Sequence, residues 1–129
     1  DGFYWIPARR DQTDYLNHVS ILHEDRTVLR MRIARLAHPH AYALDPFPST
    51  VHAITNVIVE RRGPGELELR SRFTVLQATD ALHLQPVAVG RYVDLVRRID
   101  GRWRFVSRRM IPERWGDVSE HLTFDPRSL

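Results

Sequence analysis

The dipeptide Asp100-Gly101 separates two long runs of β-branched and aromatic residues, 87–99 and 102–111. Asp-Gly favours a two-residue type I′ turn, because both positions of that turn need a left-handed backbone. The sequence therefore predicts an antiparallel hairpin with pairs counted outward from the turn. The pairs expected from this count are Arg98 with Trp103 (a cation–π contact), Val96 with Phe105, Asp94 with Ser107, and Tyr92 with Arg109.

Three further runs have the composition of strands. Residues 51–60 are dense in Val, Ile and Thr and are apolar on both faces, so we expect a central strand. Gly63-Pro64-Gly65 predicts a turn, after which residues 67–79 alternate between apolar and polar side chains. Residues 3–8 predict a strand that stops at Pro7, and residues 18–23 predict a short strand.

One helix is expected between the short strands and the long ones. Asp25 stands at an N-cap position, and Val28, Leu29, Ile33 and Leu36 follow as an apolar stripe at helical spacing. His38-Pro39 ends this helix. Strands that follow a helix in this way predict an α+β fold, with a curved antiparallel sheet and helices packed on one face, in a single domain over residues 1–129.

The composition excludes several kinds of site. The 129 residues contain no cysteine, which rules out disulfides, thiolate metal sites and cysteine nucleophiles in this chain. All 19 cationic side chains are arginines, but they are scattered and the net charge is only +3, so we expect no nucleic-acid partner. We expect no membrane association, because no apolar run is long enough to span a bilayer, and we expect a cytoplasmic protein.

A set of short motifs spread over residues 3 to about 112 identifies a family. The motifs are Tyr4-Trp5-Ile6-Pro7, Val19-Ser20-Ile21, Glu24-Asp25-Arg26, Leu29, Arg32, Arg35-Leu36, Asp45-Pro46, Pro48-Ser49-Thr50, His52, Thr55-Asn56-Val57, Gly90-Arg91-Tyr92, Asp94, Arg97-Arg98, Gly101, Trp103 and Arg108-Arg109. With this spacing the chain resembles the beta subunit of aromatic-ring-hydroxylating (Rieske-type) dioxygenases.

The resemblance implies a cone-like fold of the SnoaL-like or nuclear-transport-factor-two-like type. It implies a structural, non-catalytic subunit of an oxidoreductase complex that degrades aromatic compounds, commonly a hexamer of three alpha and three beta subunits. The alpha subunit carries the Rieske cluster and the mononuclear iron, so no cofactor is expected here. That agrees with the absence of cysteine, since a Rieske cluster needs two cysteine ligands. The family also has helices before the Tyr-Trp strand, so we expect an N-terminal helical segment to be missing.

A different function would use a cavity histidine. His52 and Asn56 lie four apart on one predicted strand and should share a face with Ile54 and Ile58. Some SnoaL-like enzymes, such as scytalone dehydratase, use such a histidine as a general base that a carboxylate orients. Here Asp94 would be that carboxylate, and Tyr92 another cavity residue, in a free-standing lyase, isomerase or hydratase. A binding module for a small apolar ligand is a third possibility, while the resemblance favours a buried polar cluster or a subunit contact.

His38-Pro39-His40 with Asp45 has the composition of a two-histidine, one-carboxylate iron site. A metal site needs ligands on a rigid backbone, and Pro39 and Pro46 interrupt this segment. We therefore interpret the segment as the C-terminal end of a helix and expect no metal.

The predicted sheet has more surface than one helix can cover. Its outer face is rich in arginine, and guanidinium groups suit interface ion pairs. We therefore expect self-association, as a trimer about a three-fold axis, with alpha subunits docked along the rim. The candidate interface residues are Arg70, Arg72, Arg97 and Arg104.

Overall fold

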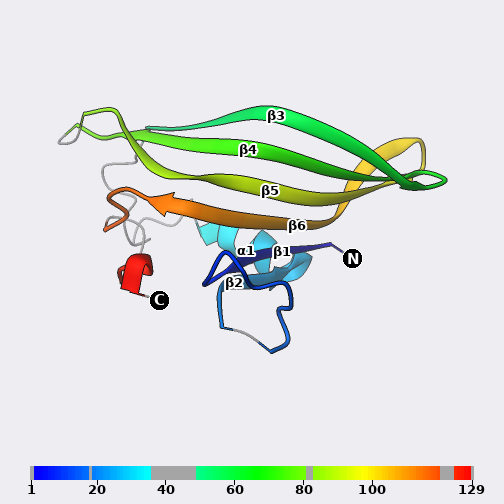
Figure 1. The fold of residues 1–129 in the computed structure, drawn as a ribbon, viewed down its shortest axis with the longest axis horizontal. Coiled ribbons are helices and arrows are strands. Elements are labelled where there is room, and N and C mark those ends of the chain that lie inside the picture. Colours follow the sequence, from blue (N-terminus) through cyan, green and yellow to red (C-terminus); the bar gives the residue numbers. More distant parts are fainter. Residues whose placement is uncertain (1, 18, 36–48, 81–82, 120–123, 129) are drawn as a thin grey trace.

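The computed structural model describes residues 2–17, 19–35, 49–80, 83–119 and 124–128, which form one sheet with a helix beside it (Figure 1). The elements in chain order are β1 (Phe3–Pro7), β2 (Ser20–Asp25), α1 (Arg26–Arg35), β3 (Ser49–Gly63), β4 (Glu66–Ala78), β5 (Gln85–Ile99), β6 (Arg102–Trp115) and a 3₁₀ turn (Pro126–Ser128). The six strands are ordered β2-β1-β6-β5-β4-β3 across the sheet.

The four long strands form three successive antiparallel hairpins and curve together along their length (Figure 1). Two of the turns use the predicted residues, with Gly65 at φ 69° and Gly101 at φ 75°. β1 adds to the open side of β6 in a parallel orientation and pairs with β2 in an antiparallel one. The prediction of an α+β fold with a curved sheet is confirmed, although one of its pairings is parallel.

β3 is an edge strand, and the prediction of a central strand was wrong. The three hairpins place β6, β5, β4 and β3 in line, and β1 adds to the other side of β6. Among the strands that the structure describes, β3 therefore has one neighbour only. Its apolar side chains are exposed in this chain on both faces, with Val59 57% exposed. A strand that is apolar on both faces is typical of one that is buried on both faces. The residues that the structure describes do not cover either face of β3.

The hairpin around Asp100-Gly101 forms as predicted near the turn and then departs from the predicted register. Ile99 pairs with Arg102, Arg98 with Trp103 and Val96 with Phe105. A β-bulge at Val106 follows, so that Leu95 pairs with Ser107. Asp94 therefore lies opposite Arg108 and not Ser107, and Tyr92 lies opposite Met110 and not Arg109.

α1 begins where the sequence predicts. The Asp25 carboxylate accepts hydrogen bonds from the backbone N–H groups of Thr27 and Val28 at 2.8 and 2.9 Å, which is an N-cap. The helix contacts β2, and Arg32 pairs with Glu24 at 2.6 Å. None of its residues is fully buried: Val28 and Leu29 are half-buried and Ile33 is 67% exposed, while Leu36 lies outside the described residues. The predicted end at His38-Pro39 falls outside the described residues.

The main hydrophobic cluster lies on one face of the sheet, which we call the Phe73 face. Alternate residues of β4 point inward there, as the sequence predicts, and Phe73 and Val75 are buried. Tyr92, Met110 and Val118 pack against them. We call the opposite face the arginine face, because Arg70, Arg72 and Arg97 lie on it. Of the helices that the structure describes, none has the length and apolar character to cross a membrane.

Candidate functional site

Asp94 and Arg108 form a partly buried ion pair on the Phe73 face. Arg108 Nε and Nη2 donate to Oδ1 and Oδ2 of Asp94 at 2.9 and 2.8 Å, a bidentate arrangement. The Asp94 side chain is 4% exposed and that of Arg108 is 33% exposed. The bulge at Val106 makes this pair, because it brings Arg108 opposite Asp94 in the register. Both carboxylate oxygens are thereby occupied.

Aromatic rings surround the ion pair. The guanidinium carbon of Arg108 lies 4.3 Å from the centre of the Tyr92 ring and 4.5 Å from that of Phe105. The Tyr4 hydroxyl donates to the Met110 sulfur at 3.0 Å. The hydrogen bonds to Asp94 raise the pKa of Arg108, while burial raises the pKa of Tyr4 and of Tyr92. The cluster is therefore a charged pair with uncharged aromatic rings packed against its guanidinium group.

The structure does not bring His52 and Asp94 together. His52 pairs with Val75 on β4, whereas Asp94 is opposite Leu69, six residues further along the same strand. Six residues of strand correspond to about 20 Å. Asp94 is held by Arg108 instead, so it does not orient a histidine. Among the residues that the structure describes, His52 and Asp94 therefore do not form a histidine–carboxylate pair.

His52 and Asn56 also fail to share the predicted face with Ile58. The pairing of β3 with β4 shifts between Thr55 and Ile58, and Asn56 adopts a left-handed backbone with φ 53°. His52 lies on the Phe73 face, opposite Val75, whereas Ile58 lies opposite Arg70 on the arginine face. The expectation holds for Ile54, which lies opposite Phe73 on the face of His52, but it was wrong for Ile58, because a bulge breaks the two-residue period there. Tyr92 lies on the Phe73 face, near Arg108 rather than His52.

The four candidate interface arginines lie on the arginine face, and three of them have partners within this chain. Arg70 pairs with Glu60, Arg72 with Glu113 at 2.7 Å, and Arg97 with Glu66 through contacts of 3.0 and 2.8 Å. Arg104 lies opposite Arg97 and borders a shallow apolar depression.

Sequence reasoning missed Arg109 and Trp5, which lie together on the arginine face. The guanidinium carbon of Arg109 is 4.5 Å from the centre of the Trp5 ring. Trp5 is 3% exposed, and its indole N–H donates to the Ser20 hydroxyl at 2.7 Å. Only the adjacency of Arg108 and Arg109 hinted at this site, because consecutive residues of a strand point to opposite faces.

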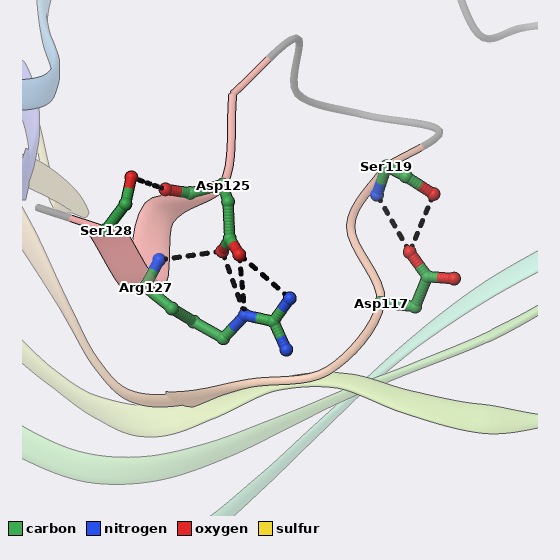
Figure 2. Close-up of polar contacts among 5 residues, drawn as sticks. All are labelled: Asp117, Ser119, Asp125, Arg127 and Ser128. Carbon is green, nitrogen blue, oxygen red and sulfur yellow. Dashed lines mark hydrogen bonds and ion pairs between the residues drawn. The ribbon is translucent and has the colours of Figure 1, made fainter.

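Polar contacts near the C-terminus are local (Figure 2). Asp117 accepts from the backbone N–H and the hydroxyl of Ser119 at 3.0 and 2.6 Å. The Asp125 carboxylate accepts from the backbone N–H and the guanidinium of Arg127. These bonds lower the pKa of both carboxyls. All of these groups are exposed, and the hydrogen bonds join residues two positions apart in the sequence. They therefore stabilise local turns of the backbone.

The candidate metal residues His38, His40 and Asp45 lie outside the described residues. Within the described part of the chain, no three side chains of the metal-binding types gather at one place.

Comparison with known proteins supplies the class. A family model described as the ring hydroxylating beta subunit matches residues 1–113. No curated protein matches the sequence.

Solved structures agree in fold. A beta subunit of an aromatic-ring-hydroxylating dioxygenase from Novosphingobium aromaticivorans has a TM-score of 0.73 at 18% identity, over 90% of this chain and 71% of that one. The beta subunit of benzoate 1,2-dioxygenase from Burkholderia mallei has a TM-score of 0.69 at 19% identity, over 88% and 70%. A chain of naphthalene 1,2-dioxygenase has a TM-score of 0.67 at 18% identity, over 88% and 62%.

The fold, and a family match over most of the chain, define a subunit of a ring-hydroxylating oxygenase. The chain belongs to the family of ring-hydroxylating beta subunits, as its sequence motifs predict.

Proposed function

We propose that this chain is a non-catalytic structural subunit that supports an iron-containing alpha subunit in the cytoplasmic degradation of an aromatic compound. The observation that carries the proposal is the state of the buried carboxylate. Both oxygens of Asp94 accept hydrogen bonds from Arg108, and His52 is far along the sheet. The Asp94 carboxylate, which is the candidate catalytic group, therefore joins β5 to β6 through its ion pair with Arg108.

The exposed apolar surface supports a role in assembly. Val51, Ile54, Val57, Ile58 and Val59 are exposed along β3. At the Asp100-Gly101 end of the sheet, Trp103 and Phe105 are 50% and 53% exposed beside a depression of about 310 Å³. Contiguous exposed apolar surface of this kind marks contacts with other chains. We propose that one such contact forms a trimer, and that alpha subunits occupy the remainder.

Co-purification with the alpha subunit tests the proposal. Light scattering should give a complex of three subunits of each kind, and each contact should bury roughly 800 Å² per partner. The chain alone should show neither iron nor flavin absorbance and should not turn over aromatic acids. Turnover by the isolated chain, or its failure to bind the alpha subunit, would refute the proposal. A stable 15.1 kDa monomer of the isolated chain would refute the trimer.

A further inference from the structure

Carboxylates on the arginine face are unevenly distributed. Glu66 neutralises Arg97, and Glu60 and Glu68 lie within ion-pair distance of Arg62 and Arg70. Further along the strands the balance changes. Arg72 and Arg91 lie opposite each other and share one carboxylate, Glu113, at 2.7 and 3.9 Å.

Arg109 adds a third guanidinium to this second group. It lies opposite Val93, two residues from Arg91 on β5, so the two arginines lie on the same face. Among the residues that the structure describes, no carboxylate pairs with Arg109, and its Nε is buried without an acceptor. This group of three arginines thus has one glutamate, which pairs with two of them, and that leaves a local excess of positive charge.

The surroundings of Arg109 are partly buried and positively charged. Burial and the positive charge of Arg91 lower the pKa of Arg109, whereas the pKa of Arg108, paired with Asp94, is raised. A carboxylate brought to Arg109 would therefore be attracted by two guanidinium groups in a partly desolvated place. Ion pairs formed in such places contribute more than fully exposed ones.

A cavity of about 290 Å³ opens beside Arg109, and we call it the Arg109 pocket. Its wall is formed mainly by Phe3, Trp5, Tyr15, Leu95, Ser107 and Arg109. The rings are packed on one another, with Tyr15 5.4 Å from Phe3 and 5.9 Å from Trp5 between ring centres. Glu68 and Asp94 also border the pocket. The Glu68 carboxylate accepts from Arg62 at 2.6 and 3.0 Å, and the Asp94 carboxylate accepts from Arg108, so both are already paired.

This combination has the character of a binding hot spot. Trp, Tyr and Arg dominate such sites, and rigid side chains lose little entropy when a partner docks. Trp5 is fixed by its hydrogen bond to Ser20, and Arg109 is fixed over the Trp5 ring. The excess positive charge favours an acidic partner. For a beta subunit, the alpha subunit is a protein partner that can supply an acidic segment.

We propose that the Arg109 pocket, with Arg91 and Arg72 at its side, docks an acidic segment of the alpha subunit. One Asp or Glu side chain of that segment pairs with the Arg109 guanidinium. The proposal rests on the proposed function, since it needs the alpha subunit as partner. It assigns the docking contact to arginines other than Arg70 and Arg97, which are already neutralised within the chain.

The test measures the dissociation constant between the full chain and the purified alpha subunit at several salt concentrations. We expect Arg109→Gln to weaken binding at least about 10-fold, Arg91→Gln about 3-fold, and both to flatten the dependence on salt. Arg109→Lys keeps a charge and should lie between Arg109→Gln and the wild type. Arg97→Gln is the matched control on the same face and should stay within about 2-fold. Circular dichroism checks the fold of every variant.

Each other outcome is decisive. Equal binding by Arg109→Gln and the wild type, with the same salt dependence, overturns the docking contact. A similar loss in Arg97→Gln shows a general charge effect and also overturns it. If Arg109→Gln instead abolishes self-association of the isolated chain, the occupant is a second copy and not the alpha subunit. If Arg109→Gln does not fold, Arg91→Gln with unchanged binding and salt dependence overturns the contact. If the wild-type chain binds no alpha subunit, the proposed function fails and the docking contact fails with it.

Discussion

Arg108 and Arg109 are consecutive on β6, yet Arg108 pairs with buried Asp94 on the Phe73 face whereas Arg109 lies over Trp5 on the arginine face. The bulge at Val106 decides which arginine takes which position. Without that extra residue, β6 would place Arg109 opposite Tyr92, on the same face as Asp94. One inserted residue thus places Arg108 beside Asp94 and turns Arg109 to the opposite face.

The Asp94–Arg108 pair should be needed for stability. Asp94→Asn leaves the Arg108 charge without its counter-charge, and we expect a loss of about 3 kcal/mol in the free energy of unfolding. Urea denaturation measures it. Asp100→Asn is the matched control, because Asn is also favoured in the turn, and it should change stability by less than about 0.5 kcal/mol. An Asp94→Asn protein with the wild-type midpoint would show that the pair contributes nothing.

Gly90 should not tolerate a side chain. A Cβ at this position would collide with the Ile111 carbonyl oxygen and lie 3.0 Å from two atoms of the Phe73 ring. Gly90→Ala must therefore push β5 and β6 apart, at a cost of about 2 kcal/mol or more. Thermal unfolding should show it as a fall of several degrees in Tm.

Gly63→Ala is the control for Gly90→Ala, because nothing lies within 4 Å of a Cβ at Gly63. It should leave Tm unchanged or raise it slightly, since alanine restricts the unfolded chain. Equal effects of the two substitutions would contradict the close contact of Gly90 with β6.

Stability should fall in alkali. Burial raises the pKa of Tyr4 and Tyr92 in the folded chain, so the unfolded chain releases these phenolic protons first as pH rises. Their contribution is complete below the unfolded pKa of about 10 and is lost progressively above it. Urea unfolding at pH 8 to 11 should show a declining midpoint.

Tyr4→Phe should make that decline shallower, at a cost at pH 8 of about 0.5–1 kcal/mol for the hydrogen bond to Met110. If Tyr4→Phe keeps the wild-type slope, the Tyr4 hydroxyl is not the group that titrates.

The exposed apolar strand β3 should take part in self-association. Val59→Lys places a charge on an exposed apolar position of the edge strand, so it should weaken association of the isolated chain by about 10-fold. Stability should change by less than about 0.5 kcal/mol. Light scattering at micromolar concentration provides the measurement. Thr50→Lys, also exposed on β3, is the control; if it weakens association equally, the effect is general repulsion and not a specific contact.

Local signals in the sequence were sufficient for most of the elements. Asp25 capped the predicted helix, Asp100-Gly101 formed the predicted turn, and the two-residue period of 67–79 placed Phe73 and Val75 inside. The family was also readable, because its motifs are short runs at fixed spacing. These features depend on near neighbours in the chain, so one sequence contains them.

Only the tertiary structure decided which residues meet across strands. Residues 51–60 look like a central strand, but β1 takes the free side of β6 and leaves β3 at the edge. His52 and Asn56 look like partners, but the left-handed backbone at Asn56 interrupts the alternation. The sequence predicts that Asp94 orients His52, but in the structure Asp94 is paired with Arg108. In each case a bulge or a strand order governs the outcome, and neither leaves a mark on the apolar pattern of the strand itself, because both arise from the pairing of distant segments.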